Sequence, residues 1–195
     1  VHALAQVCSL ATESSLPEKD LLRAVNAETP FDMTVTSIEP APQGFHAIRD
    51  AVEKTYFYQI QYGRLLNPLG RRFWWHIPAE LDWLSMQLAA RHLVGKHDFA
   101  SFQSAGAERA STVRTIRQLD IEPVEAGGFP GLRLTITADG FLYKMVRNIT
   151  GSLARVGQGT QAEDWIQFVL EQHDRQAAGQ TAPAHGLFLK HVQYE

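Results

Sequence analysis

Residues 55–62, Thr-Tyr-Phe-Tyr-Gln-Ile-Gln-Tyr, decide the fold class because they alternate strictly between two sets of side chains. In an extended chain one set shares a face: Tyr56, Tyr58, Ile60 and Tyr62. The other set shares the opposite face: Thr55, Phe57, Gln59 and Gln61. A period of two over eight residues predicts a β-strand with one packed face.

Further strands are predicted on both sides of this stretch. Residues 111–124 are extended in character, residues 127–131 form a glycine-rich turn, and residues 132–136 alternate again, so the three together predict a hairpin. Residues 187–194 predict a closing strand, and the β-branched residues 33–38 predict another. Because strands and helices do not alternate regularly, the pattern favours an α+β architecture, an antiparallel central sheet flanked by helices.

Four segments have helical patterns. Residues 15–27 begin with a Ser15–Glu18 capping box. Residues 81–94 have helical spacing through Leu81, Leu84, Leu88 and His92. Residues 141–156 form the clearest amphipathic helix. A second capping box at residues 160–163 predicts one more helix. The polar stretch 176–183 is expected to be a flexible connection.

Composition excludes several classes of protein. The 195 residues are 45% hydrophobic and 20% charged, with a net charge of −3, so any nucleic-acid surface must be a local basic patch. No apolar run approaches the length of a membrane span, and no membrane partner is expected. The single cysteine, Cys8, excludes an internal disulfide and fits a reducing, cytoplasmic setting.

Metal and hydrolase chemistry find little support in the sequence. His92, His97 and Asp98 are close together, but no paired-ligand spacing recurs elsewhere, so no metal site is predicted. A serine nucleophile elbow of the form G-x-S-x-G is missing as well. A small-molecule hydrolase therefore remains only a weak third interpretation.

Several separated segments resemble the tRNA pseudouridine synthases of the TruA type. They are Val1-His2-Ala3 with Gln6-Val7, Asn26-Ala27 with Pro30 and Asp32, Phe45-His46-Ala47, Lys54-Thr55-Tyr56-Phe57-Tyr58, Gly95 to Phe102, Arg114-Thr115-Ile116, Phe141 with Met145 to Ile149 and Gly151-Ser152-Leu153, and Gly186 to Leu189 with Val192 and Tyr194. Each is short, but their shared order covers nearly the whole chain.

The resemblance implies a fold, an activity and partners. It implies the pseudouridine synthase fold without its N-terminal portion, divided into residues 1–62, which carry the base-contacting strand, and residues 63–195, which carry the Arg147 helix and the closing strand. It also implies isomerisation of uridine to pseudouridine in the tRNA anticodon stem-loop, at positions 38 to 40, by a homodimer that needs no metal or cofactor.

Site residues also follow from the resemblance. Tyr56 would stack on a uridine turned out of the RNA, although periodicity alone favours an ordinary core aromatic. Arg147 would pair with the catalytic aspartate, although a helix arginine is more often solvated. Leu187 would line the base pocket or belong to the core. The remaining candidates, for phosphate or sugar contacts, are Lys54, His97, Arg114 and Lys144, each of which alone is better explained as a surface charge.

The chain departs from the family pattern at two places. The family's catalytic aspartate lies three positions before the valine that matches Val1, so residues 1–195 are expected to form no pseudouridine by themselves. Ile48 stands where the family has arginine, which puts one RNA contact in doubt. The alternative is a non-catalytic module of the same fold that binds structured RNA.

Overall fold

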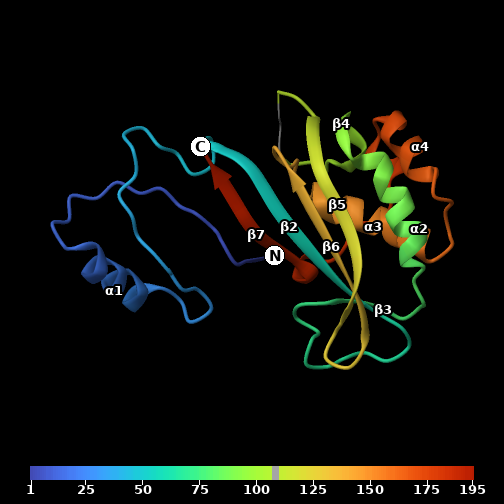
Figure 1. Ribbon diagram of the computed structural model, residues 1–195, viewed down its shortest axis with the longest axis horizontal. Coiled ribbons are helices and arrows are strands. Elements are labelled where there is room, and N and C mark those ends of the chain that lie inside the picture. The colour runs from blue at the N-terminus through green and yellow to red at the C-terminus, as the bar shows by residue number, and fades with distance from the viewer. Residues whose placement is uncertain (107–109) are drawn as a thin grey trace. The chain divides into compact units, whose positions relative to one another are not determined.

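The structure, a computed structural model, describes residues 1–106 and 110–195. The chain separates into two compact units. The larger consists of Val1–Gln6 and Ala51–Glu195, and the smaller of Val7–Asp50. Each is described by itself (Figure 1).

A mostly antiparallel sheet is the frame of the larger unit. Its strands are β1 (His2–Ala3), β2 (Ala51–Tyr62), β3 (Trp75–Ile77), β4 (Gly95–Asp98), β5 (Val113–Glu125), β6 (Pro130–Ala138) and β7 (Leu187–Tyr194). The strand order is β1-β7-β2-β6-β5-β4, with β3 also paired to β2. Only β1 with β7 and β2 with β3 run parallel within the described residues. The predicted antiparallel α+β fold, the hairpin and the closing strand are confirmed.

The core lies on the face of the sheet that carries the alternating tyrosines. Tyr58 pairs with Leu134 of β6 and Leu187 of β7, and all three are buried. Figure 1 shows α2, α3 and α4 together on one side of the strands. The prediction of a single packed face on β2 was too simple, because Phe57 and Gln59 on the other face are buried too.

Helix α2 (Trp83–Ala90) is shorter than predicted and turns a different side to the core. Of the predicted stripe, Leu84 and Leu88 are 58% and 41% exposed, whereas Leu81, which lies before the helix, is buried. The buried residues are instead Met86, Ala89 and Ala90, and α2 packs against α3. The helix has apolar residues on all of its sides, so the periodicity of the sequence could not indicate which side is buried. A 3-10 turn, Arg91–Leu93, continues it to the start of β4 at Gly95, where the predicted helix was to stop.

Helix α3 (Met145–Gly157) begins later than the pattern predicted. Lys144, just before it, is left-handed with φ of 59°, which breaks the helical path through Phe141. The predicted apolar stripe itself is confirmed, since Met145, Ile149 and Leu153 are all fully buried.

Helix α4 (Trp165–Gln172) does not use the predicted capping box. The Thr160 hydroxyl donates to the Arg155 carbonyl oxygen at 2.8 Å, and no side chain caps the helix. The Thr160 hydroxyl, which the pattern predicted to cap α4, therefore bonds the C-terminal end of α3 instead.

Residues 175–186, called the strap from here on, cross from the end of α4 to the start of β7. The sequence predicted a flexible connection at residues 176–183, but the structure packs part of this range into the protein. Ala178, Gly179 and Ala182 are buried, and the strap includes two 3-10 turns, Arg175–Ala177 and Ala184–Gly186. Two of its polar side chains, Arg175 and Thr181, form hydrogen bonds to Asn148 of α3.

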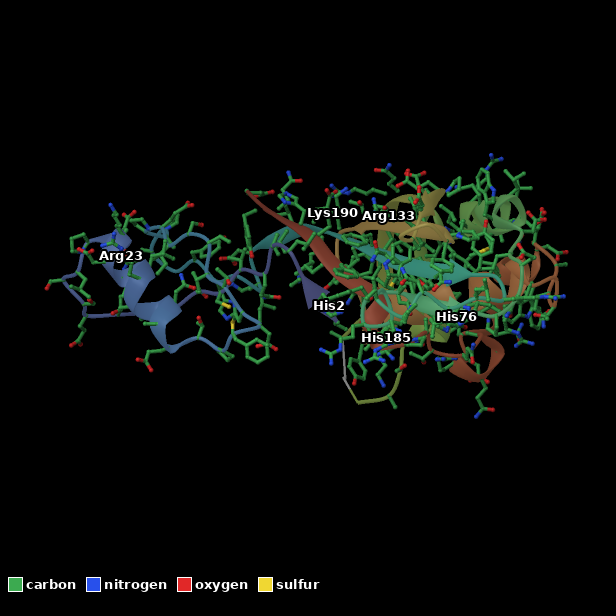
Figure 2. The ribbon with its side chains drawn as sticks, turned by 90° about the horizontal axis from the view of Figure 1, so that it is seen from below. His2, Arg23, His76, Arg133, His185 and Lys190 are labelled. Carbon is green, nitrogen blue, oxygen red and sulfur yellow. The ribbon has the colours of Figure 1, made fainter. Side chains whose placement is uncertain are left out.

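The smaller unit contains α1 (Glu18–Glu28) and extended segments. Figure 2 labels Arg23 on this helix. The helix begins without a Ser15 cap; Pro17 occupies the cap position. The predicted strand at residues 33–38 does not form. The Asn26 side chain bonds both the N–H and the carbonyl oxygen of Val35, at 2.8 and 2.9 Å, and so takes the place of a partner strand.

Candidate active site

The pairing of β2 with β7 brings the candidate base-contacting side chains together. Tyr56 lies opposite Leu189 of β7, and Tyr58 lies opposite Leu187. Tyr56 and Tyr58 point to the same face of β2 because side chains alternate along a strand. A shift of register between Thr55 and Tyr56 marks a bulge in β7 at Lys190, beside Tyr56. Bulges often re-aim side chains next to functional sites.

Arg147 projects from the first turn of α3 toward this tyrosine face. Its Nε donates to the Ala182 carbonyl oxygen at 2.6 Å, while the Ala182 N–H donates back to the Arg147 carbonyl oxygen at 3.1 Å. Within the described residues its terminal nitrogens make no recorded bond. The guanidinium is therefore held at one edge and can offer its two terminal NH₂ groups to an anion.

Arg147 is held close to the Tyr58 hydroxyl, because that hydroxyl bonds Pro183 and the Arg147 Nε–H bonds the preceding residue, Ala182. Burial raises the pKa of the Tyr58 hydroxyl well above its ordinary value, while the positive charge of Arg147 acts in the opposite direction. Burial also raises the pKa of Tyr56. Both hydroxyls are neutral at physiological pH, so the Arg147 charge is not neutralised by a tyrosinate.

Phe141 is a contact that sequence reasoning assigned only to the helix. Its ring meets Tyr56 edge to face, with centroids 5.1 Å apart. It lies in the turn between β6 and α3, and its place in the family-like pattern was the only available indication. Edge-to-face packing is a favoured arrangement of aromatic pairs, so the contact stabilises this orientation of the Tyr56 ring.

The four predicted phosphate or sugar contacts lie toward one end of the sheet. Lys54 pairs with Ala138, the last residue of β6, and Lys144 follows in the turn that leads to α3. The Arg114 guanidinium lies against Gly140 of the same turn, since a Cβ there would be 3.5 Å from its Nε. His97 lies directly opposite Arg114 in the β4–β5 ladder.

The amino-terminal end of the chain adjoins the same rows of the sheet. His2 and Ala3 pair in parallel with Phe188 and Leu189. By this register Val1 lies at the level of Leu187, the partner of Tyr58. The fold thus places Tyr56, Leu187 and Arg147 on one side of the sheet with Val1 at the adjacent edge; their roles stay a prediction.

A surface hollow lies elsewhere in the described part of the chain. It has a volume of about 780 Å³, and its lining includes Glu80, Asp82, Glu163 and Asp164. This acidic lining would repel a phosphate backbone, so the tyrosine face is the better candidate for RNA. Among residues 1–106 and 110–195, no group of three His, Cys, Asp or Glu side chains could hold a metal ion. In the same residues, no helix has the length and apolar character needed to span a membrane.

Replacing Tyr58 by phenylalanine is expected to change stability in two ways. The substitution leaves the Pro183 carbonyl oxygen, now bonded by the hydroxyl at 2.7 Å, without that partner, which costs about 1–3 kcal/mol of unfolding free energy at neutral pH. It also removes the part of the alkaline sensitivity of stability that the Tyr58 hydroxyl contributes. Because the folded pKa is raised above 10.0, the contribution of the native hydroxyl is complete below that pH and falls above it, by at most about 1.4 kcal/mol per pH unit.

Urea unfolding at several pH values between 7 and 11 would measure both effects. Tyr143→Phe is the matched control, since Tyr143 is exposed and should change neither. An unchanged alkaline slope in Tyr58→Phe would contradict the assignment of the buried neutral hydroxyl.

Comparisons with known proteins place the chain among RNA-modifying enzymes. The family model described as tRNA pseudouridine synthase matches residues 89–195. Proteins named tRNA pseudouridine synthase A from Streptococcus pneumoniae strains 70585 and Hungary19A-6 are each 38% identical to the chain over 195 residues. The alignments cover 100% of this chain and 78% of each relative. The matched range includes the Arg147 helix and the closing strand.

Proposed function

Because the chain belongs to the tRNA pseudouridine synthase family, an isomerase family, we propose that it isomerises uridine to pseudouridine in the tRNA anticodon stem-loop, at positions 38 to 40. One observation supports the proposal most: Tyr56 and Tyr58 share a face of β2, and Leu187 pairs with Tyr58. Arg147 bonds Ala182, the residue before the Pro183 that accepts from the Tyr58 hydroxyl. That arrangement suits a base turned out of a phosphate-bearing strand.

The reaction needs a surface for the extruded base. The N1–C1′ bond breaks, the base turns, C5 bonds to C1′, and the proton on C5 leaves while N1 gains one. Turning the nucleotide out of the stem-loop costs a few kcal/mol, and stacking on an aromatic ring returns roughly 1–3 kcal/mol. We assign the stacking to Tyr56, held by Phe141, and one wall of the base pocket to Leu187.

The reaction also needs an ionised carboxylate near C1′, and Arg147 is suited to hold one. Burial alone raises a carboxylate's pKa, whereas an adjacent arginine lowers it by about 1–3 units. The terminal nitrogens of Arg147 can form the two-pronged bond that also fixes orientation. In the family pattern that carboxylate is the aspartate three positions before Val1. A chain of residues 1–195 alone is therefore expected to be inactive.

Although the net charge of the chain is −3, a local group of basic residues can contact the RNA backbone. We assign phosphate or sugar contacts to Lys54, His97, Arg114 and Lys144, at the end of the sheet where β6 leads to α3. A tRNA substrate would be met in the cytoplasm, and we expect the enzyme to act as a homodimer.

Mapping of pseudouridine in tRNA tests the proposal. The enzyme would be a chain in which a Gly-Arg-Thr-Asp-x-Gly segment stands directly before Val1; its control would carry alanine in place of that aspartate. We expect pseudouridine at positions 38 to 40 from the first chain, none from the control, and none from residues 1–195 alone. Product from the control or from residues 1–195 would refute the assigned nucleophile, and unmodified tRNA from the first chain would refute the activity.

A non-catalytic RNA-binding module is the second candidate, because all four basic residues lie within residues 1–195 and binding does not need the aspartate. Titration of residues 1–195 with tRNA at several salt concentrations tests the binding surface. Lys144→Gln is expected to weaken binding and to reduce the salt slope by about 1, as the loss of one phosphate contact does. The control is Arg64→Gln, an exposed cation beyond the opposite end of β2, which should leave the slope unchanged. An equal effect of both substitutions would contradict the proposed site.

A further inference from the structure

We propose that Asn148 and Thr181 form a positioning device that acts through the strap to aim the Arg147 guanidinium. The inference rests on the proposed function for its catalytic meaning, but the device is defined by hydrogen bonds that can be tested separately. Neither residue is assigned a contact with the substrate. Their action is to hold the backbone that holds Arg147.

The Asn148 amide is fully buried and makes four hydrogen bonds. Its Nδ2 donates to the Phe102 carbonyl oxygen at 2.8 Å and to the Ser104 hydroxyl at 3.1 Å. Its Oδ1 accepts from the Thr181 hydroxyl at 2.6 Å and from Arg175 at 3.1 Å. Two donors and two acceptor sites are all that an amide possesses. Asn148 therefore ties both ends of the strap's first half to α3 and to the 102–104 loop.

The two residues of the strap that follow Thr181 bond directly to Arg147 and to Tyr58. Ala182, next to Thr181, exchanges two hydrogen bonds with Arg147, one to the backbone and one to Nε. Pro183 accepts the Tyr58 hydroxyl at 2.7 Å. His185, labelled in Figure 2, then bonds through Nε2 to the Trp74 carbonyl oxygen at 3.0 Å. The strap thus fixes the arginine and the tyrosine beneath it together.

A second contact limits how far the strap can move. The Ser152 hydroxyl accepts from the Gly179 N–H at 2.9 Å and donates to the Asn148 carbonyl oxygen at 2.9 Å. The strap is therefore anchored both before and at Thr181, and Ala182 follows directly. Removing the Thr181 hydroxyl would break its bond to Asn148 Oδ1 and the bond that it accepts from Arg175 at 3.0 Å, and would leave the Ser152–Gly179 contact in place.

Small displacements of Arg147 matter if it orients a reacting carboxylate. A misplacement of about 1 Å in a catalytic geometry can cost about 100-fold in rate. The free arginine side chain has several rotamers, and the bond to Ala182 selects among them. The strap is then a part of the catalytic arrangement, although none of its residues needs to touch the uridine.

Substitution of Thr181 tests the device with matched variants. Thr181→Val removes the hydroxyl and keeps the shape, whereas Thr181→Ser restores the hydroxyl. Thr150→Val is the control, since the Thr150 hydroxyl is also buried on α3 but bonds within the helix, to the Val146 carbonyl oxygen at 2.8 Å. Hydrogen exchange of the Arg147 Nε–H, followed by NMR in residues 1–195, reports the aim of the guanidinium without any activity.

We expect Thr181→Val to speed exchange of the Arg147 Nε–H about tenfold or more, while Thr181→Ser and Thr150→Val keep the native rate. In the chain preceded by the aspartate segment, we expect Thr181→Val to lower kcat about 10- to 100-fold with little change in KM. An unchanged Nε–H in Thr181→Val, or the same change in Thr150→Val, would overturn the device. If exchange responds as expected but no variant or parent forms pseudouridine, the proposed function fails and the device stands as structural only.

Discussion

Gly151→Ala is expected to destabilise the larger unit by about 3 kcal/mol or more. A Cβ at this position would lie 1.8 Å from the Gln180 carbonyl oxygen of the strap, so backbone must move to admit one methyl group. Alanine favours a helix over glycine by about 0.8–1.0 kcal/mol, which offsets only a part of the clash. Urea unfolding would show the loss as a lower midpoint with a similar slope.

Gly157→Ala is the matched control, at the C-terminal end of the same helix. Its Cβ would meet the Met86 sulfur at 2.5 Å, and a flexible thioether can move where a backbone carbonyl cannot. We expect a clearly smaller loss of stability. Equal losses would contradict the close approach of the strap to α3, on which the positioning of Arg147 also depends.

Arg147→Lys is expected to lower kcat about 100-fold or more in the chain preceded by the aspartate segment. Lysine keeps the charge but loses the Nε–H bond to Ala182 and the planar pair of terminal donors, so it can neither be aimed by the strap nor hold a carboxylate at two points. Removing one partner of a buried charge pair costs roughly 3–5 kcal/mol, and the retained charge should reduce that figure. Single-turnover measurement with tRNA separates the chemical step from binding.

Arg155→Lys provides the comparison for that substitution. Arg155 lies two turns further along α3 and its guanidinium stacks on Trp165 at 5.2 Å, away from the tyrosine face. Its replacement should leave kcat within about twofold. Full activity in Arg147→Lys, or an equal loss in Arg155→Lys, would show that Arg147 does not orient the nucleophile.

The elements that were predicted correctly are those whose periodicity lies within one continuous segment of the sequence. The alternation at residues 55–62 and the hairpin at residues 113–138 settle strands because a half-buried strand imposes its period on its own sequence. The stripe of α3 is settled for the same reason. Where apolar residues lie on all sides of a helix, as in α2, the local pattern does not indicate which side faces the core. The predicted buried face of α2 was therefore wrong. The division of the chain at residue 62 stays a prediction.

The candidate residues themselves were named from the sequence through the family resemblance, but their arrangement was not. Tyr56 and Arg147 are 91 positions apart, and no local pattern states that they share a side of the sheet. Phe141 and Asn148 acquire their roles only from neighbours that the fold supplies. The strap is the clearest case: its polar composition predicts flexibility, yet Asn148 of α3 accepts hydrogen bonds from Arg175 and Thr181, and Ser152 accepts one from Gly179. Sequence fixes which groups need partners, and only packing in three dimensions decides where those partners are.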